Sequence, residues 1–235
     1  MKNIPLDKQD FKKFYDQESY WLGSEDREKL EYNFAKFILK QAKDPKTVLD
    51  IGCGTGELLS AFLKLGLNVW GVDKSLYALK IAGKKVNKSN LKRVDVLKEK
   101  LPFSDNSFDI VCALDLVEHL LNEDNFFREV SRILKKGGVL FLTTPNHNSI
   151  FGFIFKNFVK DDPTHINLNK EKYWVKKVKS FGFKIKELKT IALFGFPPTR
   201  FFRNIFTKIG LPIMIRPFFT PIRSLGSTIL ILAQR

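Results

Sequence analysis

The stretch VLDIGCGTG, residues 48–56, decides how the rest of this chain is organised. It is a short apolar run with an acid at Asp50, followed by glycine at every second position from Gly52 to Gly56. The run is typical of a buried parallel strand, and glycines at this spacing allow a sharp turn and close approach of a ligand to the backbone. The next segment, ELLSAFLK at 57–64, has helical spacing. A strand, a glycine turn and a helix form the first unit of a nucleotide-binding α/β sheet, although the turn alone leaves NAD, FAD and other nucleotides open.

Two more acids follow apolar runs farther along the chain. Asp73 ends the run at 67–72 and lies 23 residues beyond Asp50, near the offset of about 20 residues expected for a carboxylate that binds a ribose. Asp95 follows the run at 91–94. Because the carboxyl ends of parallel strands meet at one edge of a sheet, these acids predict a ligand site at that edge.

The glycine spacing narrows the choice of cofactor. Residues 52–56 read GxGxG directly after an acid, whereas dinucleotide binders carry GxGxxG. Together with GVDKS at 71–75, LPFSDNSFDIV at 101–111 and LKKGGVL at 134–140, this stretch resembles the class I S-adenosylmethionine (SAM)-dependent methyltransferases, of the type 11/12 kind. The resemblance covers residues 46 to 145. It implies S-adenosyl-L-methionine as the cofactor and S-adenosyl-L-homocysteine as the product, and it says much less about the methyl acceptor.

Strands and helices alternate along the chain, which predicts a parallel sheet with right-handed crossovers. The expected fold is α/β, with a Rossmann-like, seven-stranded, mostly parallel sheet and helices on both faces. The resemblance implies that the last strand is antiparallel. The expected strands lie near 47–51, 68–72, 91–94, 108–113, 137–143, 182–188 and 227–233. The expected helices lie near 56–65, 75–86, 115–121 and 123–134.

The chain divides into two expected parts. Residues 1–45 form a helical N-terminal cap, and the resemblance implies that such a cap lies over the cofactor. Its segment 28–43 places apolar side chains on one helical face: Leu30, Phe34, Phe37 and Ile38. Its aromatic residues form part of a lid or pack the helix onto the sheet: Tyr15, Tyr20 and Trp21. Residues 46–235 form the methyltransferase domain, with a Phe-rich, basic insertion at about 194–226.

The resemblance also implies roles for the residues at the strand ends. Asp73 suits the two ribose hydroxyls, because an ionised carboxylate accepts two strong hydrogen bonds. Asp95 would accept from the adenine amino group, and the Val96 amide would face the ring. Asp50 would hold either the turn or the cofactor's ammonium group. The full implied cofactor site consists of Asp50, Gly52, Cys53, Gly54, Thr55, Gly56, Asp73, Lys74, Asp95, Val96 and Leu114.

A second group of candidates follows the fourth expected strand. Asp115, Glu118 and His119 stand at i, i+3 and i+4, so in a helix they would share one face. With His165 they resemble the E-x-x-E-H plus distant T-H pattern of metal-assisted methyltransferases, which include ubiquinone-biosynthesis O-methyltransferases and small-RNA 2′-O-methyltransferases. That resemblance implies a divalent ion such as Mg²⁺. Asp115 departs from the pattern, since it is one methylene shorter than glutamate.

The same histidines also fit chemistry without a metal. His119 or His165 could act as general base for a hydroxyl nucleophile, because neutral imidazole titrates near working pH. In metal-free relatives the histidine of this motif orients the loop or touches the substrate. The third histidine, His147, is expected in a loop after the fifth strand.

Cysteine content and net charge indicate the expected cellular compartment and the kinds of partner. The chain has 235 residues, two cysteines and a net charge of +15, of which +12 falls in residues 146–235. Isolated cysteines, no apolar run of membrane length and no signal-peptide core predict a cytoplasmic protein in a reducing compartment. The basic field favours an anionic substrate, an anionic membrane surface or nucleic acid, unless it is only a solvated face. Nothing in the sequence indicates an oligomeric state.

The sequence therefore predicts an enzyme, a SAM-dependent methyltransferase. The expected reaction is O-methylation of a small or lipophilic molecule by in-line methyl transfer, with peripheral contact to an anionic membrane. One alternative is an RNA methyltransferase that uses the basic C-terminal region. Another is a SAM-binding regulator or partner subunit without catalysis.

Overall fold

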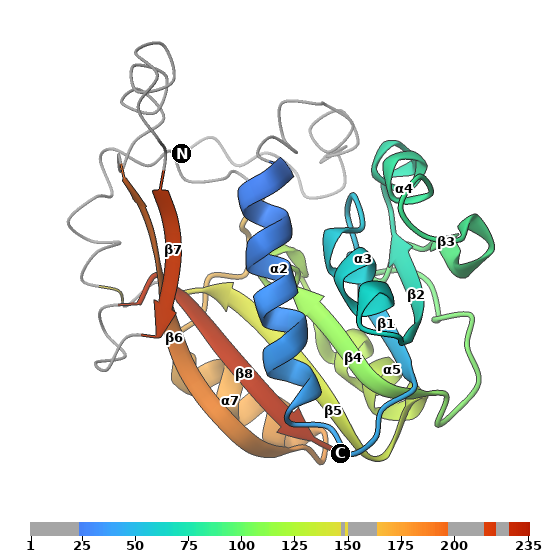
Figure 1. Ribbon diagram of the computed structural model, residues 1–235. Coiled ribbons are helices and arrows are strands. Elements are labelled where there is room, and N and C mark those ends of the chain that lie inside the picture. Colours follow the sequence, from blue (N-terminus) through green and yellow to red (C-terminus); the bar gives the residue numbers. More distant parts are fainter. Residues whose placement is uncertain (1–23, 147–148, 150–163, 197–213, 220–225) are drawn as a thin grey trace.

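The computed structural model describes residues 24–146, 149, 164–196, 214–219 and 226–235 (Figure 1). Its centre is one eight-stranded sheet with the order β3-β2-β1-β4-β5-β8-β6-β7. The strands are β1 (Thr47–Ile51), β2 (Asn68–Asp73), β3 (Leu91–Arg93), β4 (Phe108–Leu114), β5 (Leu134–Pro145), β6 (Lys184–Phe196), β7 (Met214–Phe219) and β8 (Thr228–Gln234). The first five strands pair in parallel, whereas β8 runs antiparallel to β5 and β6, and β7 antiparallel to β6. The strand order reverses between β1 and β4, which is where such sheets bind ligands.

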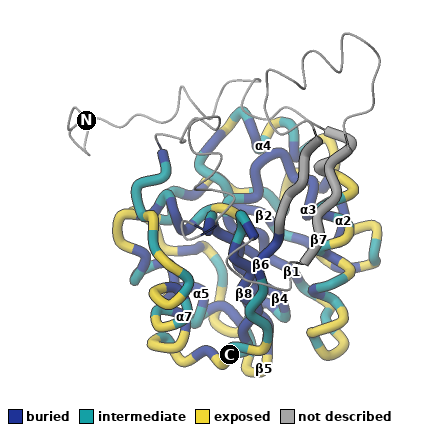
Figure 2. The backbone as a smooth tube through the Cα atoms, turned by 90° about the vertical axis from the view of Figure 1, so that its left-hand side faces the viewer, coloured by how far each residue is buried: buried dark blue, intermediate teal, exposed yellow. Residues whose placement is uncertain are grey.

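Helices cover both faces of the sheet (Figure 1). The helices α2 (Ser24–Leu39), α3 (Glu57–Lys64) and α4 (Leu76–Ala82) lie on one face, and α5 (Asp124–Ile133) and α7 (Glu171–Ser180) lie on the other. Each face has its own apolar core, because successive side chains of a strand point to opposite sides. In β5, for example, Phe141 packs with the α2 and α3 side, whereas Leu140 and Leu142 pack with the α5 and α7 side. Figure 2 shows the buried strands inside and the exposed outer surfaces of α5 and α7.

The seven expected strands are all present, with the expected antiparallel last strand, so the predicted fold class is confirmed. The structure adds an eighth strand, β7, from within the segment that was expected to be an insertion at 194–226. β6 is longer than expected and pairs with it through residues 191–196. Residues 197–213 and 220–225 of that insertion, residues 1–23 of the expected cap with Tyr15, Tyr20 and Trp21, and His147 lie outside the described residues.

The helix expected at 115–121 is wrong. Only a 3-10 turn, η4 (Val117–His119), forms there. Asp115 has φ 47°, a left-handed conformation that cannot belong to a right-handed helix. Asp115, Glu118 and His119 therefore do not share a helical face. The N-terminal helix α2 also ends at Leu39, four residues before the expected end.

Glycine is required where β1 turns into α3. Gly52, Gly54 and Gly56 have φ of 77°, 50° and 80°, which glycine adopts without steric cost. A Cβ atom at Gly56 would also lie 2.9 Å from the Cβ atom of Ala82 in α4. The alternating glycines therefore shape the turn and let α4 pack against it.

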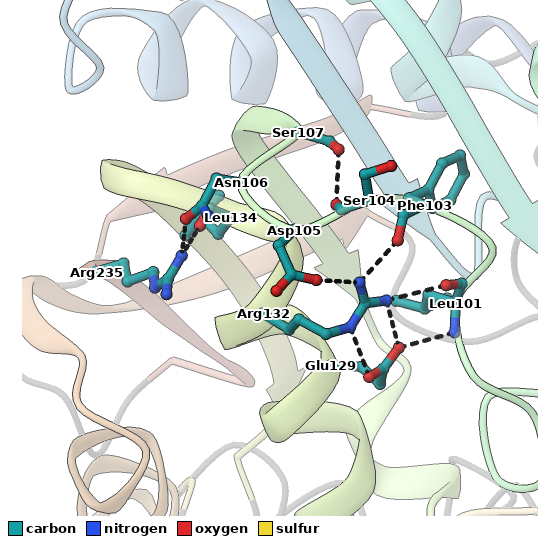
Figure 3. Close-up of polar contacts among 10 residues, drawn as sticks. All are labelled: Leu101, Phe103, Ser104, Asp105, Asn106, Ser107, Glu129, Arg132, Leu134 and Arg235. Atoms are coloured by element: carbon teal, nitrogen blue, oxygen red, sulfur yellow. Dashed lines mark hydrogen bonds and ion pairs between the residues drawn. The ribbon is translucent and has the colours of Figure 1, made fainter.

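Two groups of polar contacts lie where the parallel strands begin, at the edge of the sheet opposite their carboxyl ends. Arg132 of α5 binds Glu129 and Asp105, and it donates to the carbonyls of Leu101 and Phe103 (Figure 3). The motif at 101–111 thus fixes the loop before β4 to α5.

Among the described residues, no helix is both long and apolar enough to cross a membrane.

Asp109 of β4 forms the second group. Its Oδ2 atom accepts from the amides of Lys46 and Thr47 at 2.9 Å each and from the Thr47 hydroxyl at 2.8 Å, and its Oδ1 accepts from Lys135 at 2.8 Å. Burial by itself would raise the pKa of Asp109, but these donors outweigh it and lower the pKa to about 2. The carboxylate therefore joins the beginnings of β1, β4 and β5.

Candidate cofactor and catalytic site

A cavity of about 390 Å³ opens at the carboxyl ends of the parallel strands. Its wall comes from the ends of β1, β2, β4 and β5, from η4, and from helix α2. Six of the eleven residues expected around the cofactor belong to this wall: Gly52, Asp73, Lys74, Asp95, Val96 and Leu114. The volume lies in the range of small-molecule sites, about 300–1,000 Å³.

Asp73 is held firmly at the end of β2. Its Oδ2 accepts from the Gly54 amide and its Oδ1 accepts from the Ser75 amide, both at 2.8 Å. Burial raises the pKa of Asp73, and the two amides oppose that effect. Because each carboxylate oxygen has two lone pairs, the group can keep these bonds and still accept from a pair of ligand hydroxyls.

Asp95 and Lys74 form the neighbouring part of the wall. The Leu97 amide donates to the Asp95 Oδ1 at 3.1 Å, which orients the carboxylate after β3. Burial lowers the pKa of Lys74, whereas the nearby charges of Asp95 and Asp73 raise it. Lys74 thus shares this part of the wall with the two carboxylates that were expected to bind adenosine.

The other five residues expected around the cofactor lie in or beside the glycine turn and are not among the described residues that line the cavity: Asp50, Cys53, Gly54, Thr55 and Gly56. The Thr55 hydroxyl donates to Glu57, which also pairs with Lys85 at 2.8 Å. Burial raises the pKa of the Cys53 thiol well above its usual value, and the charges of Asp73 and Asp50 add to this, so the thiol stays protonated.

His119 brings a titratable ring into the wall of the same cavity. Its Nδ1 lies 3.0 Å from both the carbonyl oxygen and the hydroxyl oxygen of Thr164. The carbonyl can only accept a hydrogen bond, whereas the hydroxyl can donate or accept, so the hydroxyl is compatible with either tautomer of the neutral ring. Thr164 thereby holds the ring in place, and the tautomer with the proton on Nδ1 is the one in which Nε2 can act as a general base or a metal ligand.

Glu118 and the neighbouring His119 come together with His165, which lies 46 residues farther along the chain. Their ligand atoms lie within 4.8 Å of one another, and the two imidazole centroids are 4.9 Å apart. Glu118 is 1% exposed, and its Oε2 accepts from Thr144 at 3.1 Å. One carboxylate and two imidazoles are a ligand set that divalent transition metals use.

Asp115, the fourth expected metal ligand, is not part of this group among the described residues. Its Oδ1 accepts from the Thr143 hydroxyl at 2.9 Å, and its amide donates to the Thr143 carbonyl at 3.1 Å. These bonds hold the left-handed backbone at Asp115 and turn it into the cavity wall. Such strained residues concentrate at functional sites.

A network that the sequence analysis missed holds the segment carrying His165. The amides of Ile166 and Asn167 donate to the Glu118 carbonyl at 3.0 and 2.8 Å. The Asn167 side chain donates to Glu123 at 3.1 Å, and Lys177 of α7 pairs with Glu123 at 3.0 Å. Burial alone would raise the pKa of Glu123, but bonds from Tyr173 and Lys177 lower it. No motif marks these residues, because the contacts join three separate segments.

Helix α2 supplies a further part of the wall that the sequence did not specify. Leu30, Glu31 and Phe34 face the cavity, opposite Ile191 and Thr228 of the antiparallel strands. The amphipathic pattern at 28–43 indicated an apolar face and could not indicate which residues of it reach the ligand. The helix is therefore packed onto the sheet and borders the site.

This sheet order, with an acid at the end of β2 and a glycine turn after β1, is that of a Rossmann-like methyltransferase fold. The family described as "Methyltransferase domain" matches residues 49–142. The sequence is 35% identical over 105 residues to a ubiquinone biosynthesis O-methyltransferase of Pelagibacter ubique, which covers 42% of each chain. It is 40% identical over 125 residues to an uncharacterized protein of Methanocaldococcus jannaschii, covering 53% of this chain and 47% of that one.

A solved structure extends the likeness of the fold to nearly the whole chain. A SAM-dependent methyltransferase of Thermotoga maritima aligns with a TM-score of 0.62 and 21% identity, over 95% of this chain and 97% of that one. The curated relatives, in contrast, are matched over less than half of their length. The resemblance to class I SAM-dependent methyltransferases is confirmed.

Proposed function

We propose that this protein transfers the methyl group of S-adenosylmethionine to a hydroxyl group of a small or lipophilic molecule. The observation that carries the proposal is His119, whose ring lines the same cavity as Asp73 and Asp95 and has Nδ1 fixed by Thr164. The likeness to a ubiquinone biosynthesis O-methyltransferase supports a hydroxyl acceptor.

The residues divide the work of such a reaction. When bound, S-adenosylmethionine supplies an electrophilic methyl group on a sulfonium. Asp73 accepts from the ribose hydroxyls, and Gly52 lets the backbone approach the ligand closely. His119 Nε2 would take the proton of the acceptor hydroxyl as the oxygen forms its bond to the methyl carbon and the bond of that carbon to sulfur breaks, which leaves S-adenosylhomocysteine. The remaining task is to hold the reacting atoms in line, which the cavity walls and helix α2 favour.

A divalent ion is a refinement of the same proposal. Glu118, His119 and His165 would hold it, since their three ligand atoms lie within 4.8 Å of one another, and with two imidazoles among them this set suits a transition-metal ion better than Mg²⁺. An ion there would lower the pKa of the acceptor hydroxyl. Asp115 is left out of this version, since its carboxylate is bonded to Thr143.

Calorimetry and methyl-transfer assays test the proposal together. The wild-type protein is expected to bind S-adenosylhomocysteine and to transfer labelled methyl groups to phenolic or lipid-linked hydroxyls. His119→Gln is expected to keep cofactor binding and to lose about 10²–10⁴-fold in transfer, the usual contribution of a general base. Chelation that abolishes transfer, restored by a divalent ion, would favour the metal version. Transfer that is unaffected by His119→Gln would contradict the role of this ring.

The charge of the chain favours a second candidate acceptor. Residues 146–235 carry a net charge of +12, which suits RNA phosphates or an anionic membrane surface. Steeply salt-dependent RNA binding with methylated RNA as product would favour the RNA methyltransferase. Sedimentation with anionic vesicles at low salt would favour a membrane contact that brings a lipophilic acceptor to the enzyme. Cofactor binding without transfer to any acceptor class would instead favour the non-catalytic alternative.

A further inference from the structure

Exposed apolar side chains gather beside the segment that carries His119. Six large hydrophobic side chains of the described residues are exposed, and three of these lie in one region: Leu121 at 52%, Leu168 at 45% and Tyr173 at 37%. Glu123 joins the segments that carry them. It follows Leu121 by two residues, accepts from the Asn167 side chain at 3.1 Å, and accepts from the Tyr173 hydroxyl. Separate segments of the chain therefore place apolar side chains on one part of the surface.

Lysines are interleaved with these apolar side chains. Residues 168–180 contain five lysines and one acid, Glu171. Lys177 pairs with two carboxylates at the start of α5. The other four lysines are exposed and form no ion pair with a described residue: Lys170, Lys172, Lys176 and Lys179. Lys172 and Lys176 are one turn apart in α7, so they share a side of that helix. The apolar and basic side chains together form the α7 patch: Leu121, Leu168, Lys170, Lys172, Tyr173 and Lys176.

The α7 patch lies on the outer side of a wall of the cavity. His119 and Leu120 line the cavity, whereas the next residue, Leu121, is exposed. The segment before α7 is fixed to the same wall, because the Asn167 amide donates to the Glu118 carbonyl at 2.8 Å. A surface that binds the patch would therefore lie beside the ring that is proposed to take the acceptor's proton.

An anionic membrane suits both parts of the patch. Leucine side chains are stabilised at the boundary between headgroups and acyl chains, and neighbouring lysines are attracted to anionic headgroups. RNA suits it less well, because proteins that bind single strands stack the bases on aromatic rings. Tyr173 is the single aromatic member of the patch. Its hydroxyl is bonded to Glu123, and the Lys177 ammonium group lies 5.6 Å from its ring centroid.

We propose that the α7 patch is a docking surface for an anionic lipid bilayer. It assigns the membrane contact to named side chains, which the net charge of residues 146–235 could not do. Docking does not depend on the chemistry of the cavity. Its consequence rests on the proposed function, since a lipophilic acceptor would then pass from the bilayer into the cavity beside His119.

Co-sedimentation with vesicles tests the docking without an assay of methyl transfer. Wild-type protein is expected to bind vesicles of mixed phosphatidylcholine and phosphatidylglycerol, and not to bind vesicles of phosphatidylcholine alone. Leu121→Gln with Leu168→Gln is expected to weaken binding about tenfold or more, because two apolar side chains no longer leave water. Lys172→Gln with Lys176→Gln is expected to weaken binding by about fivefold for each lysine removed.

Matched pairs on and near α3 and α4 are the controls. Leu63→Gln with Leu76→Gln changes two leucines that are 46% and 58% exposed. Lys80→Gln with Lys84→Gln removes two exposed lysines at the same four-residue spacing. Both pairs are expected to leave vesicle binding within about twofold, because charges beyond a Debye length from the bilayer are screened. Urea midpoints equal to that of the wild type would show that all four variants are folded.

Three results would overturn the docking proposal. Wild-type protein that stays in the supernatant with both kinds of vesicle would refute it and leave the proposed methyl transfer untouched. Equal weakening by the patch pairs and the control pairs would assign the binding to net charge. Loss of RNA binding in the patch pairs, with vesicle binding retained, would assign the patch to nucleic acid. Vesicle binding that depends on the patch, in a protein that transfers no methyl group, would support the docking surface and refute the proposed function.

Discussion

The acid sensitivity of this fold is expected to depend on Asp109. Its pKa is lowered from 3.8 to about 2 by donors from Lys135, Lys46 and Thr47, which outweigh the effect of burial. A carboxyl group whose pKa is lower in the folded state stabilises that state above its unfolded pKa. This stabilisation is lost as the pH falls from about 4 toward 2. At about 1.4 kcal/mol per pKa unit, the difference corresponds to roughly 2.5 kcal/mol of unfolding free energy as an upper bound.

Solvent reduces this figure, because the Asp109 side chain is still 22% exposed. Screening leaves an expected contribution of roughly 1–2 kcal/mol at pH 7, about half of which is lost by pH 3. The assay is urea unfolding of wild-type protein and Asp109→Asn at several pH values from 7 to 3. The variant is expected to be less stable at pH 7, and the gap is expected to narrow as the pH falls.

Asp105→Asn is the matched control. Asp105 pairs with Arg132 at 2.8 Å but is 68% exposed, so its removal is expected to cost less than about 1 kcal/mol. Stability curves of wild type and Asp109→Asn that stay parallel from pH 7 to 3 would refute the reasoning.

Three further predictions concern the site and its support. Asp73→Asn is expected to weaken S-adenosylhomocysteine by about 10²-fold or more by calorimetry, because the amide cannot accept from both ribose hydroxyls while keeping its bonds to the turn; an unchanged affinity would contradict the assigned site. Asn167→Ala is expected to lower the turnover number and to leave the affinity for S-adenosylhomocysteine within about twofold. The reason is that the substitution removes the hydrogen bond between the His165 segment and Glu123 without changing the adenosine end of the cavity. Equal losses of turnover and affinity would indicate a general folding defect. Gly56→Ala is expected to lower the free energy of unfolding in urea by about 3 kcal/mol, because the position has a positive φ and the added carbon would contact Ala82. Gly66→Ala also has a positive φ, 87°, but nothing lies within 4 Å of the added carbon, so the expected loss is only about 1–2 kcal/mol. Equal losses in the two variants would refute the contact argument.

Local patterns in the sequence determined much of this protein. The apolar run and glycines at 48–56 require a strand, a turn with positive φ and a helix, because only glycine adopts those angles freely. Asp73 could be assigned to the ligand edge because strands that are parallel end at one side of the sheet. The alternation of strands and helices along the chain predicted the seven strands, which are confirmed.

Tertiary structure decided what local patterns do not encode. His119 and His165 lie 46 residues apart, and their meeting depends on bonds from the Glu118 carbonyl and on the Asn167 contact to Glu123. Asp115 looked like part of a helix, but Thr143 of β5 holds it in a left-handed conformation. No sequence motif marked Glu31, which is 6% exposed and lines the cavity because α2 packs against the sheet. In each case the deciding contact comes from another segment of the chain, so its free energy appears only when the sheet has brought the segments together.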